Sequence, residues 1–232
     1  MHTFYQPEIS TGQLLPDESW HALKVLRLKE GDEIKLTDGK GNFCRAKITK
    51  ADPRLCEFKS IQQEQITQSA VSIHLAIAPT KNSERIEWMI EKCVEIGIEK
   101  ISFIQCKTSE RKSMNMERLE KIVISAMKQS GQAWLPDITQ MMPFEKFVTN
   151  SAERNKFIAY VDGTNQVFLK NQKTVGSDSV ILIGPEGDFT KEELAMATSA
   201  DFLKVSLGPN RLRTETAGLV AVMTLNVITK QL

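Results

Sequence analysis

The sequence has few of the residues that build metal centres or disulfide frameworks. Its 232 residues include four cysteines and three histidines, and no two cysteines form a C-x-x-C pair. Zinc sites and disulfide frameworks need such ligands in pairs or clusters. We therefore expect neither metal nor disulfide, and we interpret the cysteines as reduced and mostly buried thiols.

Three further absences narrow the class of protein. No apolar run reaches the roughly 20 residues that span a bilayer, and the start MHTFYQPEIS lacks the pattern of a secretory signal. We expect a cytoplasmic protein with no membrane partner. The formal net charge is only +1, which argues against a polyanion binder held by bulk charge but leaves room for local basic patches. Neither G-x-G-x-x-G nor G-x-x-x-x-G-K-[ST] occurs, so dinucleotides and ATP lose support as ligands.

The first part of the chain is rich in strand signals. Residues 32–48 alternate in two short runs around the turn Asp38-Gly39-Lys40-Gly41, which predicts a β-hairpin. Another strand is expected at residues 55–60. Several short strands joined by tight turns suggest a small barrel over residues 1–68. The polar stretch 62–69 is expected to hold the domain boundary.

From residue 71 the pattern alternates between strands and helices. Apolar residues recur at helical spacing from Ile86 to Val94 and from Leu119 to Met127, with Gly97 at the end of the first helix. This alternation predicts an α/β domain over residues 69–232, with a mostly parallel sheet covered on both sides. The strands are expected at residues 71–78, 100–106, 157–161, 180–183 and 202–207.

Two glycine-bearing loops follow the late strands, at residues 183–189 and 207–217. The first leads at once into a helix, because Thr190 and Glu193 have the spacing of a capping box. Open parallel sheets bind ligands beyond the carboxyl ends of their strands, and glycines let the backbone approach a ligand closely. The two loops together predict a ligand site built mainly from main-chain atoms.

The strings LIGPEGDFTKEELA and LGPNRLRTETA resemble the signatures of a known family. This is the ribosomal RNA small subunit methyltransferase E family, the 16S ribosomal RNA uridine-N3 methyltransferases of the SPOUT superfamily. The resemblance covers essentially the whole chain, through HALKVLRLKEGD, Pro79, Lys81, Arg85, EKCVEIGI, TSER and KQSGQ. The chain departs from the family pattern at Asp188, where glycine is more frequent, at Gln132, where arginine is frequent, and over residues 209–211.

The resemblance implies an α/β fold with a C-terminal trefoil knot and a small N-terminal PUA-like β-barrel that docks RNA. It also implies a homodimer acting on 16S ribosomal RNA, within the small ribosomal subunit. The apolar run 217–228 would suit a subunit interface, with a buried helix of the monomer as the alternative. The implied cofactor is S-adenosylmethionine, held by Ile183, Gly184, Gly187, Leu207, Gly208, Leu212, Arg213 and Thr216.

Methylation of uridine N3 requires that its proton leave. Arg213 is the candidate cation for the resulting anion, or a clamp on a phosphate, and Glu186 or Glu215 is a candidate proton acceptor. Each carboxylate has a structural alternative: Glu186 could bond backbone amides, and Glu215 could favour the start of a helix. The expected phosphate contacts are Lys24, Arg27, Arg45, Lys47, Arg111 and Lys112. The three tryptophans, Trp20, Trp88 and Trp134, are expected to pack in the core or an interface rather than to stack on bases.

The sequence leaves three alternative functions open. A related knotted enzyme would methylate the ribose 2′-oxygen instead of a base. A non-enzymatic RNA-binding assembly factor would keep the fold without turnover. An NAD-linked oxidoreductase lacks the glycine fingerprint it would need.

Overall fold

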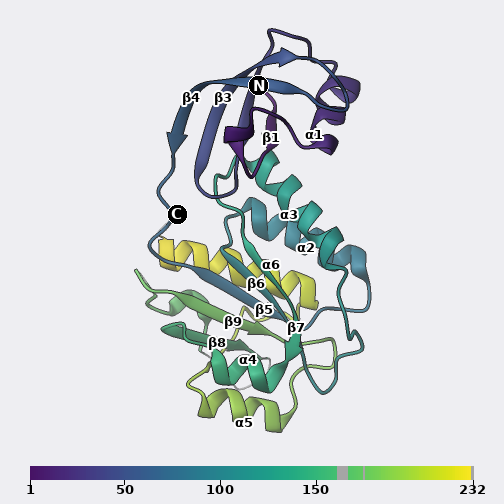
Figure 1. Cartoon of the computed structure of the whole chain (residues 1–232). Coiled ribbons are helices and arrows are strands. Elements are labelled where there is room, and N and C mark those ends of the chain that lie inside the picture. Colours follow the sequence, from purple (N-terminus) through teal and green to yellow (C-terminus); the bar gives the residue numbers. More distant parts are fainter. Residues whose placement is uncertain (161–166, 175, 231–232) are drawn as a thin grey trace. The chain divides into compact units, whose positions relative to one another are not determined.

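The structure is a computed structural model that describes residues 1–160, 167–174 and 176–230. The chain separates into two compact units (Figure 1). The first consists of Met1–Gln68 and Ile124–Leu135, and the second of Ser69–Val123 and Pro136–Leu232. The expected division into residues 1–68 and 69–232 did not anticipate that a segment from the middle of the chain packs with the N-terminal residues.

The first unit is built on a four-stranded sheet in the order β1-β2-β3-β4, with β1 parallel to β2 and the other neighbours antiparallel. The predicted hairpin is present as β2 and β3, and the Asp38 carboxylate accepts hydrogen bonds from the Lys40 and Asn42 amides in its turn. Outside these strands, Gln13 forms an antiparallel bridge with Glu57 of the edge strand β4. The elements are β1 (Thr3–Tyr5), η1 (Ile9–Thr11), α1 (Pro16–Trp20), η2 (His21–Val25), β2 (Glu33–Thr37), β3 (Asn42–Lys50) and β4 (Glu57–Gln65).

Strand β4 is longer than the sequence predicted. Its residues 62–65 belong to the stretch that we expected to be a featureless boundary, and all four are exposed. They form a strand because they pair with β3, from Asn42 to Arg45. Residues 62–65 are therefore a strand because of their pairing with β3, since their own sequence carries no alternating pattern of hydrophobic residues.

The second unit contains a six-stranded sheet in the order β10-β8-β9-β5-β6-β7, in which all neighbours are parallel. The predicted parallel α/β sheet is thus confirmed, and β5 and β9 are buried along their whole length. Edge strand β7 and helix α4 were not predicted. The elements are β5 (Ile73–Ile77), α2 (Ser83–Glu95), β6 (Lys100–Gln105), α3 (Met116–Ser130, whose end belongs to the first unit), β7 (Asp137–Pro143), α4 (Phe144–Asn150), β8 (Asn155–Ala159), η3 (Leu169–Asn171), β9 (Ser179–Ile183), α5 (Lys191–Ser199), β10 (Leu203–Val205), α6 (Thr214–Leu225) and η4 (Asn226–Lys230).

Helices cover both faces of this sheet. Figure 1 shows α4 and α5 on one side and α2 and α6 on the other, in agreement with the contacts of α4 with α5 and of α2 with α6. Gly218 permits the close approach of α6, because a Cβ there would lie 2.7 Å from the Met89 sulfur and 3.2 Å from Ile77. Within the described residues, no helix combines the length and apolar character needed to cross a membrane.

The four cysteines are free and buried, as expected. Burial raises the pKa of Cys56 to about 11 and that of Cys93 to about 12. These thiols are therefore protonated at neutral pH and do not serve as nucleophiles.

Candidate functional site

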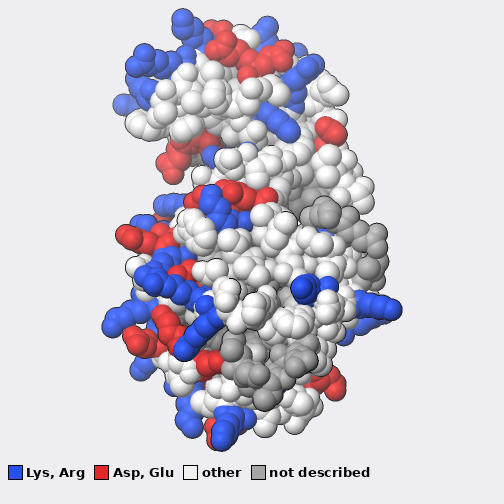
Figure 2. Space-filling view, turned by 180° about the vertical axis from the view of Figure 1, so that it is seen from behind, with Lys and Arg blue, Asp and Glu red and all other residues white. Residues whose placement is uncertain are grey.

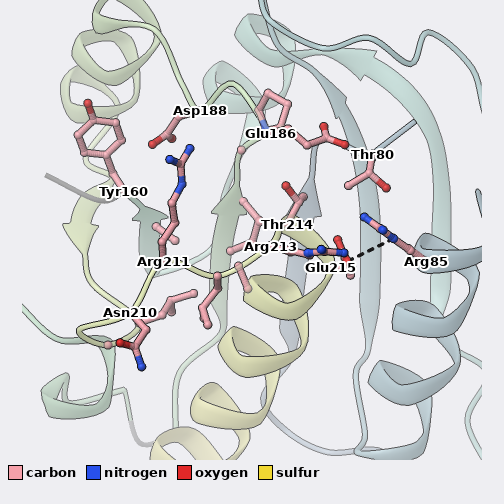
Figure 3. A pocket seen from close by; sticks show the side chains of 18 of the residues that line it. Thr80, Arg85, Tyr160, Glu186, Asp188, Asn210, Arg211, Arg213, Thr214 and Glu215 are labelled. Carbon is pink, nitrogen blue, oxygen red and sulfur yellow. Dashed lines mark ion pairs between the residues drawn. The ribbon is translucent and has the colours of Figure 1, made fainter. Parts of the chain in front are cut away.

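A cavity of about 590 Å³ opens in the second unit at the carboxyl ends of β8, β9 and β10 and the start of α6 (Figure 3). Its position is the one expected for a ligand site of an open parallel sheet, and its volume lies in the range of small-molecule sites. The residues that line it are Thr80, Arg85, Ala159, Tyr160, Ile183, Gly184, Pro185, Glu186, Asp188, Val205, Leu207, Gly208, Asn210, Arg211, Leu212, Arg213, Thr214, Glu215 and Ala217.

The loop after β9 turns sharply before α5. The predicted capping box is present, with the Thr190 hydroxyl accepting from the Glu193 amide and the Glu193 carboxylate accepting from the Thr190 amide. Gly187 faces Thr108, whose Cβ would be 3.1 Å from a Cβ at position 187. The Thr108 hydroxyl also donates to the Asp188 carbonyl oxygen. The TSER motif thus supports this loop from the side.

Asp188 explains one departure from the family pattern. Its φ of +62° lies in the left-handed region. Glycine adopts this conformation without steric cost, and aspartate is tolerated there better than most residues. One carboxylate oxygen accepts from the Phe189 amide at 2.8 Å. Burial raises the pKa of the Asp188 carboxyl, against the opposing effects of this amide and of Arg211.

The loop after β10 leads into α6, and its backbone at Gly208 is uncovered on the side that faces the cavity. Gly208 has a φ of +154°, and no described atom lies within 4 Å of the position of a Cβ there. The Ser206 hydroxyl bridges the loop by donating to the Gly208 carbonyl oxygen and accepting from its amide. Arg213 caps α6 with extended backbone and without a side-chain hydrogen bond to the helix. Its exposed side chain points toward the region of Glu215 (Figure 3).

A carboxylate and an arginine form an ion pair at the wall of the cavity. Arg85 Nε lies 3.8 Å from Glu215 Oε1, and the Glu215 side chain is only 8% exposed. The other oxygen, Oε2, is buried and has no hydrogen-bond partner among the described residues. Glu215 lies in the first turn of α6, where the helix N-terminus favours a negative charge.

Most of the predicted cofactor and catalytic residues line this cavity, and two do not. Gly187 packs on Thr108 instead, and Thr216 lies between the lining residues Glu215 and Ala217 without lining the cavity itself. The sequence did not single out Tyr160 or Val205 for the site, although both lie at ends of predicted strands. The predicted residues on the cavity are Ile183, Gly184, Glu186, Leu207, Gly208, Leu212, Arg213 and Glu215.

The predicted phosphate contacts fall into two sets. Lys24, Arg27, Arg45 and Lys47 are exposed on the first unit, and Arg45 lies 3.8 Å from Glu33. In the second unit Lys112 is exposed. The Arg111 guanidinium already donates hydrogen bonds within the chain, to the Lys81 carbonyl oxygen and to the Ser83 hydroxyl. Figure 2 shows basic and acidic side chains interspersed on the face it displays, in keeping with the small net charge.

The KQSGQ segment belongs to the first unit rather than to the cavity. Lys128 Nζ lies 2.6 Å from a Glu18 carboxylate oxygen. The Trp134 ring packs so closely on Gly41 that a Cβ there would be 2.5 Å away, and the Trp134 indole donates to the Ile66 carbonyl oxygen. Trp134 is therefore a packing residue, as predicted.

The other two tryptophans do not pack in the core of the chain, and packing at an interface stays a prediction for them. Trp20 is 56% exposed at the end of α1, and Trp88 is 45% exposed on α2. Within the described ranges, no three His, Cys, Asp or Glu side chains gather as a metal site would require.

Comparison with known proteins now adds to this geometry. Residues 67–226 match the family described as "RNA methyltransferase domain", and residues 14–59 match the "RNA methyltransferase PUA domain". The "Ribosomal RNA small subunit methyltransferase E" of Rickettsia conorii is 29% identical over 93% of this chain and 89% of its own length. The chain belongs to the ribosomal RNA small subunit methyltransferase E family.

Solved structures agree with this family membership. A "probable rRNA-methyltransferase" from Porphyromonas gingivalis is 43% identical, with a TM-score of 0.93 over 100% of this chain and 99% of the other. The ribosomal RNA small subunit methyltransferase E of Neisseria gonorrhoeae, bound to S-adenosyl methionine, is 28% identical with a TM-score of 0.88. The match covers 99% of this chain and 98% of the Neisseria gonorrhoeae chain. The expected family and the PUA match near the N-terminus are thus confirmed.

Proposed function

We propose that this protein transfers a methyl group from S-adenosylmethionine to N3 of a uridine in 16S ribosomal RNA. The observation that carries the proposal is the cavity at the ends of β8, β9 and β10, in a chain whose relative of the same fold binds this cofactor. Because ribosomal RNA is the substrate, the cytoplasm is the proposed location.

The residues of the cavity fit the cofactor. Ile183, Leu207 and Leu212 provide an apolar surface for the adenosine part. The open side of Gly208 leaves room for a ligand against the backbone. When bound, the cofactor supplies an electrophilic methyl group, so the protein has to supply position and a good nucleophile.

The side chains of the cavity would convert uridine N3 into a good nucleophile. Uridine N3 is a poor nucleophile while it carries its proton, and the deprotonated base is an anion. The Arg213 guanidinium, fixed at the cavity, would stabilise that anion by about 1.4 kcal/mol for each pKa unit it lowers. Glu215 or Glu186 would accept the proton. Glu215 is favoured because one of its oxygens is buried without a described partner, whereas Glu186 is exposed.

The trefoil knot remains a proposal, and the packing of α6 supports it. Helix α6 contacts the sheet strands β5 and β9 and also η3. Because η3 belongs to the connection between β8 and β9, the C-terminal helix packs against a described part of this connection. The Thr174 hydroxyl of this connection lies 2.8 Å from the Thr229 hydroxyl of η4, which follows α6, and the two form a hydrogen bond. Threaded chains are very rare, so the feature would have to be specific to this family.

A homodimer is proposed from the apolar surface of α6 and its neighbours. Met223 on α6, Val227 on η4 and Trp88 on α2 are each between 44% and 48% exposed. Large apolar side chains left open in this way are typical of a surface covered by a partner. We propose a second copy of the chain as that partner, and sedimentation of Met223→Glu as a monomer would support it.

The first unit is proposed to dock RNA. Its exposed Lys24, Arg27, Arg45 and Lys47 would contact phosphates. Exposed Trp20 adds a ring that can stack on an unpaired base.

The test of the function is to map modified nucleosides in ribosomal RNA from a strain lacking the protein. We expect loss of one N3-methyluridine in 16S ribosomal RNA, restored by the wild-type gene but not by Arg213→Ala. Purified Arg213→Ala should keep its thermal unfolding midpoint, because this side chain is exposed. Loss of a 2′-O-methylated ribose instead would refute the proposed target, uridine N3. Full restoration by Arg213→Ala would refute the proposed role of the Arg213 cation.

A further inference from the structure

Two departures from the family pattern lie on the same wall of the cavity. Asp188 comes from the loop after β9 and Arg211 from the loop after β10, and both line the cavity. The loops are separated in sequence, but Figure 3 shows the Arg211 guanidinium pointing toward the Asp188 carboxylate. The two charges are opposite, and the electrostatic effect of Arg211 reaches the Asp188 carboxyl. The chain therefore carries a carboxylate and a guanidinium together on this wall of the cavity.

The charges of Asp188 and Arg211 remain available to a ligand. One Asp188 oxygen accepts from the Phe189 amide, and among the described residues no donor is bonded to its second oxygen. Arg211 is exposed, and the described residues give its guanidinium neither a hydrogen bond nor an ion pair. By contrast, Glu215 at the same cavity is already paired with Arg85. Of the two acid and arginine couples, only the one formed by Asp188 and Arg211 is open.

We propose that Asp188 and Arg211 bind the amino-acid end of the cofactor, with its ammonium group on Asp188 and its carboxylate on Arg211. This inference rests on the proposed function, since it concerns the same cavity. The amino-acid end is a zwitterion, and an acid facing an arginine offers a partner of the correct sign for each of its groups. A guanidinium fork matches a carboxylate in geometry as well as in charge.

The arrangement of the cavity agrees with this orientation. The apolar side chains Ile183, Leu207 and Leu212 suit the adenosine part, whereas Asp188 is half-buried and Arg211 is exposed. A zwitterion is costly to bury, so its place is where the cavity meets solvent. The ligand would thus lie with its apolar part inward and its charged end between the two loops.

The experiment is calorimetric and needs no methyl transfer. S-adenosylhomocysteine and 5′-methylthioadenosine share the adenosine thioether, and only the first has the amino-acid end. We would measure the Kd of both ligands for the full-length protein and for Asp188→Asn and Arg211→Gln. The asparagine keeps the acceptor for the Phe189 amide and tolerates the left-handed backbone. Lys146→Gln, an exposed lysine on α4, is the matched loss of one positive charge away from the cavity.

Each cavity variant should weaken S-adenosylhomocysteine by about 10- to 100-fold, the range for a lost charged hydrogen bond. Binding of 5′-methylthioadenosine should change less than about twofold, as should both ligands with Lys146→Gln. Asp188→Gly, which suits the backbone of this position, should reproduce the loss seen with asparagine. Unchanged S-adenosylhomocysteine binding, or an equal loss for both ligands, would overturn the inference while leaving the proposed function intact. Wild-type protein that binds neither ligand would instead overturn the proposed function, and the inference with it.

Discussion

Replacing Glu215 by glutamine tests the chemistry of the cavity, because it removes a charge and almost no volume. Arg85 Nε lies 3.8 Å from Glu215 Oε1. At that separation the attraction is about 1 kcal/mol in water and about 4 kcal/mol at an effective dielectric constant of 20. Since the Arg85 side chain is 46% exposed, the lower end applies, and the helix N-terminus adds about 0.5 kcal/mol. Charge removal should therefore cost about 1–2 kcal/mol of folding free energy.

An opposite effect nearly cancels this cost. Glu215 Oε2 is buried without a hydrogen-bond partner among the described residues, and such an unmet polar group costs about 1–3 kcal/mol. A neutral amide is cheaper to leave unpaired than a charged oxygen. We therefore expect Glu215→Gln to unfold in urea within about 1 kcal/mol of the wild type. Single-turnover methyl transfer should fall at least about 100-fold, because a general base contributes that much or more.

The control is Glu192→Gln, the same chemical change in the first turn of α5, where the side chain is exposed outside the cavity. It should remove only the small stabilisation that a first-turn carboxylate gives a helix and leave methyl transfer unchanged. A Glu215→Gln variant that loses more than about 2 kcal/mol of stability and still transfers methyl groups at the wild-type rate would exclude Glu215 as the base. In that case the carboxylate would be a structural partner of Arg85.

Three further predictions concern stability and RNA binding. Gly41→Ala should lose about 1–3 kcal/mol in urea unfolding, because its Cβ would lie 2.5 Å from the Trp134 ring and its φ is +95°; an unchanged midpoint would contradict the packing. Burial raises the pKa of Glu153, but its hydrogen bond and attraction to His74 outweigh this, so the pKa is lowered from 4.5. Its contribution to stability is therefore present above that value and lost as the pH falls through the folded-state pKa. Glu153→Gln should accordingly be less stable than wild type at pH 7 and approach it in acid, whereas a gap that persists in acid would exclude this linkage. Arg27→Glu should weaken binding to the small subunit or its RNA and flatten the decline of affinity with salt, and equal affinity at all salt concentrations would remove Arg27 from the RNA surface.

The sequence predicts those elements whose signals are local. Strand β9 is apolar from Val180 to Ile183, and the capping box formed by Thr190 and Glu193 marks the start of α5. Strand β7 and helix α4 lack such signals. Every residue of β7 is exposed or only partly buried, as suits an edge strand, and α4 has seven residues after Pro143. These two elements form because the neighbouring strand β6 and the sheet face offer them a place to pack.

The same distinction applies to the site. The loops around Gly184 and Gly208 were predicted from glycines at strand ends, and both line the cavity. Thr80 and Tyr160 were not singled out, because they follow β5 and β8, which lie far from β9 in sequence. They reach the site because β9 lies between β8 and β5 in the sheet. Periodicity reports where strands are, but it does not report their order.

The first unit contains a segment from the middle of the chain, which the order of its strands does not explain. Ile124–Leu135 packs with Met1–Gln68, and it does so through a largely buried ion pair between Lys128 and Glu18 and through the Trp134 ring on Gly41. Removal of the N-terminal residues would therefore leave Lys128 without its carboxylate and expose the face of Trp134. An unpaired, partly buried charge and an uncovered aromatic ring are both costly. The match to a PUA domain at residues 14–59 consequently marks a recognisable sequence unit rather than a separable one, and the end of α3 is part of its fold.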